Sequence, residues 1–175
     1  MTDNERLAEL LFPNISWTPQ QYEEQYPARQ LPEGARVTRF SPSPTGYLHI
    51  GGLFAAMTAR LTAKATSGVF FLRIEDTDKK REVEGGVTAI VTGLAAFGIT
   101  PDEGITGLGT ESGVYGPYQQ SKRREIYQCF AKELVRQGLA YPCFCTEAEL
   151  TALREQQEAQ AVNKGYYGCL LYTSP

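Results

Sequence analysis

The stretch from Arg39 to Gly52 limits what this chain can fold into more than any other part. It reads Arg-Phe-Ser-Pro-Ser-Pro-Thr-Gly-Tyr-Leu-His-Ile-Gly-Gly and contains the only histidine of the sequence, His49. Residues 37–40 alternate like the end of a strand, and the two prolines that follow stop ladder pairing. Gly46 favours a turn that other residues would strain. The stretch therefore predicts a strand, a turn and the start of a helix, in this order.

The predicted helix begins with open backbone amides. Apolar residues follow at intervals of four, and they are Leu53, Met57, Leu61 and Ala65. Such a stripe is typical of a helix that packs on one face. The free N–H groups and the positive dipole end of its first turn favour an anion, and His49 can add a donor to phosphate oxygens. The predicted phosphate-binding residues are His49, Ile50, Gly51 and Gly52.

A second strand end carries acidic residues. Residues 69–74 form a short apolar run, typical of a buried parallel strand, and Gly68 before it fits a helix C-cap. Glu75, Asp76, Thr77 and Asp78 follow directly. An acidic cap of the next helix is one interpretation of these residues. The other is a ligand site, because the ligand crevice of an open parallel sheet lies at the carboxyl ends of its strands.

The two strand ends would together suit an amino-acid substrate. A cation binds its carboxylate and a carboxylate binds its ammonium, and such charge-assisted bonds are strong. The first strand end offers Arg39, Ser41, Ser43 and His49, and the second offers Glu75 and Asp76.

The order of the following segments indicates an α/β fold. Residues 83–97 have one apolar face and end at Gly98, which predicts a crossover helix. The alternation of strand and helix predicts a Rossmann-like, doubly wound parallel sheet. Residues 100–116 are rich in glycine and acidic residues, which indicates a loop. A long helix is then expected from an N-cap at Ser121 to Gly138.

Composition limits the class of protein further. The chain has 175 residues, 42% of them hydrophobic, and a net charge of -3. No run approaches the length of a membrane span and the first residues lack the pattern of a secretory signal, so a cytoplasmic location is expected. A binder of RNA normally shows a basic footprint. Any RNA contact would need a local patch such as Lys122, Arg123 and Arg124, for which a solvated first helical turn is the alternative.

Two segments resemble a known family. The string Pro-Ser-Pro-Thr-Gly, followed by His-Ile-Gly-Gly, resembles the first signature of class I aminoacyl-tRNA synthetases, in the version of the glutamyl enzymes. Residues 72–78, Leu-Arg-Ile-Glu-Asp-Thr-Asp, are similar to the second signature of glutamyl-tRNA synthetases. The resemblance covers roughly residues 22–168, the first half of a catalytic domain and the start of an inserted acceptor-binding region.

The resemblance implies a function and roles for residues. The reaction would be activation of glutamate by ATP with Mg²⁺ to glutamyl-adenylate, then transfer to the terminal ribose of tRNA(Glu), by a monomer. Arg39 would meet a carboxylate of glutamate, Ser41 and Ser43 would line its pocket, and Glu75 would hold its amino group. His49 and the backbone at Gly51 would meet the ATP phosphates. Asp76, Lys122, Arg123 and Arg124 are candidate tRNA contacts.

Two cysteines close together in the sequence are candidate zinc ligands. Cys143 and Cys145 lie in a predicted strand at 141–145, ahead of a capping box from Thr146 to Glu149. Thiolates one residue apart could supply half of a structural zinc site. Cys169 is the one further candidate ligand, so both zinc and two reduced structural cysteines remain open.

Four regions are expected along the chain. Residues 1–35 form an N-terminal extension, which Trp17, Tyr22 and Tyr26 could anchor by burial, or which could bind a partner. Residues 36–120 form the first half of the nucleotide-binding domain. Residues 121–168 form a helix and the start of the inserted region, and residues 169–175 depart from the family.

Alternative functions remain at this point. Because the family's second ATP motif is absent from these residues, the chain alone is expected to be inactive. A shortened paralogue that glutamylates a modified tRNA base, of the glutamyl-Q tRNA(Asp) synthetase type, would look similar here. A non-catalytic tRNA-binding or scaffold fragment is the second alternative. A small nucleotidyltransferase is disfavoured, because it gives no reason for the second signature.

Overall fold

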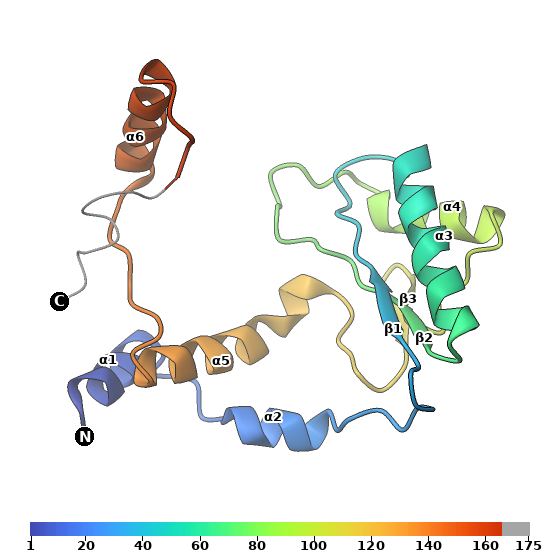
Figure 1. Cartoon of the computed structure of the whole chain (residues 1–175), viewed down its shortest axis with the longest axis horizontal. Coiled ribbons are helices and arrows are strands. Elements are labelled where there is room, and N and C mark those ends of the chain that lie inside the picture. Colours follow the sequence, from blue (N-terminus) through green and yellow to red (C-terminus); the bar gives the residue numbers. More distant parts are fainter. Residues whose placement is uncertain (166–175) are drawn as a thin grey trace. The chain divides into compact units, whose positions relative to one another are not determined.

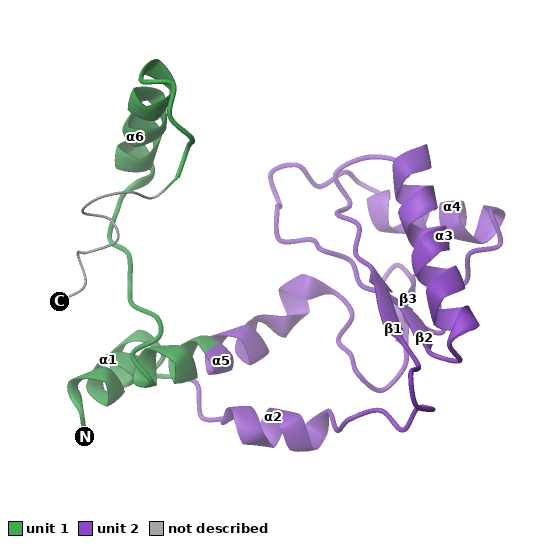
Figure 2. Cartoon of the chain, viewed as in Figure 1, with its two compact units in different colours: residues 1–14, 131–175 green, residues 15–130 purple. Residues whose placement is uncertain are grey.

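The computed structural model describes residues 1–165, which fall into two compact units. One unit holds residues 15–130, and the other holds residues 1–14 together with the chain from 131 onward (Figure 2). The predictions for Cys169 and for residues 169–175 lie outside the described residues.

The larger unit carries the sheet and the helices that pack on it (Figure 1). Its elements are α2 (Pro19–Gln25), β1 (Val37–Phe40), α3 (Ile50–Ala65), β2 (Val69–Leu72), α4 (Gly86–Ala96), β3 (Glu103–Gly107), β4 (Thr110–Ser112) and the 3₁₀ turn η1 (Gln120–Arg123). Helix α5 (Arg124–Arg136) begins in this unit. Helices α1 (Asp3–Leu11) and α6 (Glu147–Ala159) belong to the smaller unit.

The strands of the described chain form one sheet in the order β1-β2-β3-β4. β1 and β2 are parallel, with Val37 opposite Val69 and Phe40 opposite Leu72. β2 and β3 are also parallel, and β4 pairs with β3 in the antiparallel sense. The predicted α/β fold with an open, mainly parallel sheet is thereby confirmed.

The hydrophobic core lies between the sheet and the two crossover helices. The Thr38 hydroxyl donates to the Ala59 carbonyl of α3 at 2.8 Å, so the side chains of Thr38 and of Phe40, two residues on, point toward that helix. Arg39, between them, points to the other face of the sheet. The buried core residues include Phe40, Phe70 and Leu72 of the strands, Ala56 and Ala63 of α3, and Ile90 and Leu94 of α4.

Three local predictions are wrong. Residues 100–116 are not all loop, because they contain β3 and β4. Strand β3 is hard to foresee, since it pairs with β2 at only two positions and contains Gly104. Residues 141–145 form no strand, and they lie in the unit whose described part holds only helices. Ser121 is not an N-cap, because it lies within η1 and its hydroxyl bonds to Asp76.

The end of α3 also differs from the prediction. The left-handed residue is Ser67 (φ 52°), not Gly68. The Ser67 and Gly68 amides donate to the carbonyls of Lys64 and Ala63, which is the Schellman pattern with Ser67 in the place that usually holds glycine. Gly68 is needed for another reason. A Cβ there would lie 1.9 Å from the Arg36 carbonyl oxygen, so only glycine lets the two backbones pass.

The second part of the N-terminal extension belongs to the larger unit. Pro19 is the first residue of α2, where proline is tolerated, and Thr18 caps the helix. Tyr22 is buried and its ring lies 4.9 Å from that of Trp17 and 6.4 Å from that of Phe130. Burial of Tyr22 supports the predicted anchoring for residues 15–35, whereas Trp17 is 45% exposed and is not buried as predicted.

A network of charged and phenolic groups ties the same extension to the sheet. Arg29 makes a two-pronged ion pair with Glu103 of β3, and its guanidinium lies 3.8 Å from the centre of the Tyr115 ring. The Tyr118 hydroxyl donates to the same carboxylate at 2.7 Å. The hydrogen bonds from Arg29 and Tyr118 hold the pKa of Glu103 below its usual range. Burial and this bond to Glu103 raise the pKa of Tyr118 to about 12.

In the smaller unit, α1 begins with a capping box formed by Thr2 and Glu5. Ala8 is its buried residue, whereas Leu10 is exposed. Lys132 donates to Glu9 at 2.8 Å, and the predicted capping box from Thr146 to Glu149 is present at the start of α6. Over residues 1–165, no helix combines the length and the apolar character needed to cross a membrane.

Replacement of Ser67 by glycine should stabilise the larger unit, because it removes left-handed strain from a residue with a Cβ. We expect a gain of up to about 1 kcal/mol in the free energy of unfolding, measured by urea titration with circular dichroism. Gly98 offers the reverse test, since it has φ 67° and a Cβ there would meet nothing within 4 Å. Gly98→Ala should destabilise by about 1 kcal/mol. An unchanged midpoint for both variants would contradict this account.

The Glu103 network should make the larger unit sensitive to acid. Because the folded-state pKa of Glu103 is lowered, its contribution is present above the ordinary pKa of about 4.3 and is lost as the pH falls below it. Glu103→Gln should lower the free energy of unfolding of the larger unit at pH 7 by about 3 kcal/mol, because it removes the carboxylate that pairs with Arg29. The stability of this variant should also change less between pH 7 and acidic pH than that of the parent. Asp78→Asn, which removes the exposed ion pair with Arg81, is the control and should change little. Identical pH profiles for Glu103→Gln and the parent would refute the prediction.

Candidate active site

Backbone hydrogen bonds join the two strand ends that carry the predicted site residues. The Arg73 amide donates to the Phe40 carbonyl and the Glu75 amide to the Pro42 carbonyl, each at 3.0 Å. Further along, the Val83 amide donates to the Pro44 carbonyl at 2.9 Å. The turn after β1 and the segment after β2 therefore run side by side at the carboxyl edge of the sheet.

A cluster of three charged side chains lies on the sheet face opposite α3. One Glu75 carboxylate oxygen is 3.1 Å from an Arg73 nitrogen and 3.8 Å from an Arg39 nitrogen. The Arg39 side chain is 41% exposed and only loosely paired, so it can accept another anion. The Arg73 side chain is 18% exposed, and its Nε is buried without a hydrogen-bond partner.

Arg73 is a site residue that the sequence analysis missed. It comes two residues before Glu75, and side chains alternate along an extended chain, so the two share one face. The period of two in Arg-Ile-Glu-Asp could have revealed this pairing before the structure did.

His49 is the N-cap of α3. Its Nδ1 accepts a hydrogen bond from the Gly51 amide at 3.1 Å, and its backbone is extended (φ -109°, ψ 170°). An acceptor at Nδ1 leaves the proton of the neutral ring on Nε2. The exposed imidazole can therefore donate outward from Nε2, next to the open amides of the helix start.

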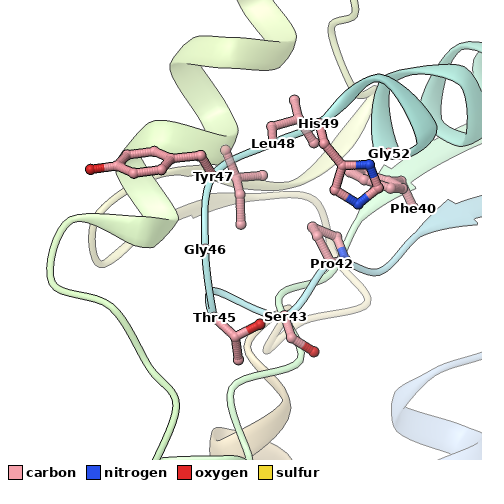
Figure 3. Close-up of a pocket in the computed structure, with 10 residues that line it drawn as sticks. Phe40, Pro42, Ser43, Thr45, Gly46, Tyr47, Leu48, His49 and Gly52 are labelled. Atoms are coloured by element: carbon pink, nitrogen blue, oxygen red, sulfur yellow. The ribbon is translucent and has the colours of Figure 1, made fainter.

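A pocket opens between the turn and the start of α3 (Figure 3). Its lining residues are Phe40, Pro42, Ser43, Thr45, Gly46, Tyr47, Leu48, His49, Gly52 and Ile90. The polar groups among them are the hydroxyls of Ser43, Thr45 and Tyr47 and the His49 ring, and the Tyr47 ring points away from the imidazole (Figure 3).

The predicted residues thus fall into two neighbouring groups. Ser43, His49 and Gly52 line the pocket, whereas Arg39 and Glu75 form the ion cluster on the other face. Ser41, Ile50 and Gly51 do not line the pocket. Pro42 joins the groups, because its ring lines the pocket and its carbonyl accepts the Glu75 amide.

The glycines around the turn differ in what a side chain there would meet. A Cβ on Gly51 would lie 3.0 Å from the His49 ring, and one on Gly52 would lie 2.9 Å from Leu48. Both glycines thus make room for side chains of the turn itself. The prediction for Gly46 is wrong, because its φ is not positive and a Cβ there would meet nothing within 4 Å. Gly86 of α4 lets the Pro44 carbonyl approach, since a Cβ would lie 2.9 Å from that oxygen.

The structure gives no support to an RNA contact through Asp76 or Arg123. Asp76 is 1% exposed and its carboxylate is bonded to neighbouring protein groups. Arg123 turns inward and donates to the carbonyls of Tyr115 and Pro117. Lys122 and Arg124 are exposed, so a contact with RNA phosphates remains open to these two.

No group of three or more metal-ligating side chains occurs within residues 1–165. The Cys143 side chain is exposed and that of Cys145 is half-buried. Zinc at Cys143 and Cys145 stays a prediction, because its third candidate ligand lies outside this range.

Comparison with known proteins relates these features to a family. The family model for the catalytic domain of class I tRNA synthetases (E and Q) matches residues 36–173. Glutamate–tRNA ligase from Clostridium perfringens is 54% identical over 164 residues, which are 94% of this chain and 30% of that protein. The ligase from Acetivibrio thermocellus is 53% identical over 167 residues, which are 95% of this chain and 30% of that protein.

A solved structure of a glutamate-tRNA synthetase is also similar to this chain. The crystal structure of glutamate-tRNA synthetase from Elizabethkingia anophelis aligns with a TM-score of 0.66 and 42% identity, over 77% of this chain and 26% of that one. The chain thus spans about a third of the length of the curated relatives named above. It belongs to the class I tRNA synthetases (E and Q) and corresponds to part of their catalytic domain.

Proposed function

We propose that the chain is part of a cytoplasmic glutamate–tRNA ligase, with glutamate, ATP and tRNA(Glu) as substrates. The observation that carries this proposal is the pairing of the two strand ends. The bond from the Glu75 amide to the Pro42 carbonyl sets a cation and carboxylate cluster directly beside the pocket of His49. Relatives named glutamate–tRNA ligase support the choice of amino acid.

In the proposed reaction, the ion cluster binds glutamate. Arg39 receives a carboxylate of the substrate and Glu75 receives its ammonium, while Ser43 and Ser41 contribute hydroxyls. Arg73 holds the Glu75 carboxylate in place when no substrate is bound, since the two lie 3.1 Å apart. These interactions orient the substrate carboxylate toward the α-phosphate of ATP.

The start of α3 binds the phosphates of ATP. The His49 Nε2–H and the amides of the first turn, from Ile50 to Gly52, donate to phosphate oxygens and stabilise the charge that builds there. When Mg²⁺ accompanies ATP, it would add charge neutralisation at these phosphates. The glutamate carboxylate attacks the α-phosphate of ATP and displaces pyrophosphate. The ribose hydroxyl of the tRNA then attacks the activated carbonyl carbon, loses its proton and displaces AMP. No protein nucleophile is needed for either step.

The role of His49 can be separated from its role as a helix cap. In the full-length gene product, His49→Ala should lose roughly 10²- to 10³-fold in glutamate-dependent pyrophosphate exchange, measured with tRNA present, and keep its affinity for glutamate. His49→Asn is the matched variant, because asparagine caps helices well and lacks the ring donor. It should lose as much activity while keeping the thermal stability of the parent. Normal exchange by His49→Asn would rule out the phosphate-donor role.

The proton position on His49 can be measured directly, because this is the only histidine of the sequence. At pH 8.5, where an ordinary imidazole is neutral, ¹⁵N NMR of the labelled chain should show the proton on Nε2 and a bare Nδ1. Gly51→Ala should disturb this state, since its Cβ would lie 3.1 Å from Nδ1. Gly46→Ala, whose Cβ would enter open space, should not. A proton found on Nδ1 in the parent would overturn the proposed donor geometry.

A further inference from the structure

Asp76 is a buried carboxylate for which the proposed reaction has no use. It follows Glu75 directly, and its side chain has no exposed surface. A buried charge is costly unless it is paired and hydrogen-bonded. The partners of Asp76 therefore indicate what this residue does.

The partners come mainly from a segment more than 40 residues away in the sequence. One oxygen of Asp76 accepts the Ser121 amide at 2.9 Å, and the other accepts the Ser121 hydroxyl at 2.6 Å and the Gln119 side chain at 2.8 Å. Lys79 adds a bond of 3.0 Å. Burial by itself raises the pKa of Asp76, but these four bonds together hold it well below its usual range. Both oxygens of the carboxylate thus accept hydrogen bonds from protein groups, which favours its charged form.

Backbone bonds extend the same connection. The Ile74 amide donates to the Tyr118 carbonyl, and the Gln120 amide donates to the Ile74 carbonyl. Residues 118–121 therefore lie along one side of the segment that follows β2. The hydrogen bonds between Asp76 and Ser121 hold the last residue of this contact. On the other side, the Glu75 amide is bonded to the Pro42 carbonyl.

Glu75 thus lies between two attachments, one through Pro42 and one through Asp76. The Pro42 bond alone fixes one amide of the segment and leaves the peptide after Glu75 free to turn. The bonds of Asp76 remove that freedom, because its side chain is held at both oxygens. The backbone of Glu75 is thus held from both sides, while the ion pair with Arg73 holds the carboxylate itself.

We propose that Asp76 is a positioning residue that orients Glu75, and through it the ammonium group of the amino-acid substrate. The proposal rests on the function proposed above. Asp76 and Ser121 should therefore affect the binding of the amino acid. They should not affect the binding of ATP, because its phosphates are proposed to bind at the start of α3.

The test is steady-state pyrophosphate exchange by the full-length gene product with tRNA present. Asp76→Asn keeps the shape of the side chain and removes the charge that orders its donors. The KM for glutamate should rise about 10- to 100-fold, the size of effect expected when a binding group is displaced by about 1 Å, with the KM for ATP within about 3-fold of the parent. Ser121→Ala removes only the hydroxyl bond and should raise the KM for glutamate in the same direction by less.

Two variants serve as controls. Glu82→Gln removes a carboxylate that is bonded to the same Lys79, at 2.8 Å, but not to residues 119–121. It should leave both KM values unchanged. Gly98→Ala strains the backbone after α4, in the same unit but away from residues 118–121, and it should lower thermal stability without a selective rise in the KM for glutamate.

The outcomes separate the two proposals. If the parent is active and folded Asp76→Asn has an unchanged KM for glutamate, the role of Asp76 is overturned and the proposed function stands. If Asp76→Asn does not fold, an unchanged KM in Ser121→Ala has the same meaning. Equal rises of both KM values overturn it as well, because they indicate general loosening. A parent protein without any glutamate-dependent exchange overturns the proposed function and this inference together.

Discussion

The parallel pairing of β1 with β2 is the constraint on which the site depends. It sets Phe40 opposite Leu72, and the bonds beyond the strands continue as far as Pro42 and Glu75. Parallel strands end at the same edge of a sheet, so the two segments that follow must meet there. A shift of this register by one residue would exchange the faces of Arg39 and Phe40, and would move the guanidinium into the core.

Helices α3 and α4 protect this pairing from one face, and the turn after β1 is packed against both. Leu48 contacts the position of Gly93 in α4, and Phe40 lies close to Gly52 in α3. The glycines at these places are sites of close approach between elements. The turn is thus packed against the helices at Leu48, next to His49, and open where it lines the pocket.

The other face of the sheet is organised by charge. Arg29 and Tyr118 meet at Glu103, while Arg39 and Arg73 meet at Glu75. The first cluster is nearly enclosed and satisfied by protein groups, so it holds the N-terminal extension in place. The second retains an exposed arginine that is only loosely paired, so it can bind a further anion. Two carboxylates on one face thus differ in role because their surroundings differ in exposure.

Local patterns in the sequence were sufficient for the strands β1 and β2, for α3, α4 and α6, and for the placing of both signature segments at one edge. Each of these rests on short-range chemistry, namely apolar periodicity, proline and glycine stops, and capping residues, which act within a few positions of the chain. Only the tertiary structure decided that Arg39 and His49 serve different faces, that Ser121 bonds to Asp76, that Ser67 takes the left-handed position, and that Arg123 turns inward. The faces of Arg39 and His49, the bond from Ser121 to Asp76 and the close approach of Gly68 to Arg36, which leaves the left-handed position to Ser67, depend on residues more than 30 positions apart, which no local pattern encodes. Arg123 turns inward to carbonyls six and eight residues before it, and a basic run in the sequence does not show that direction.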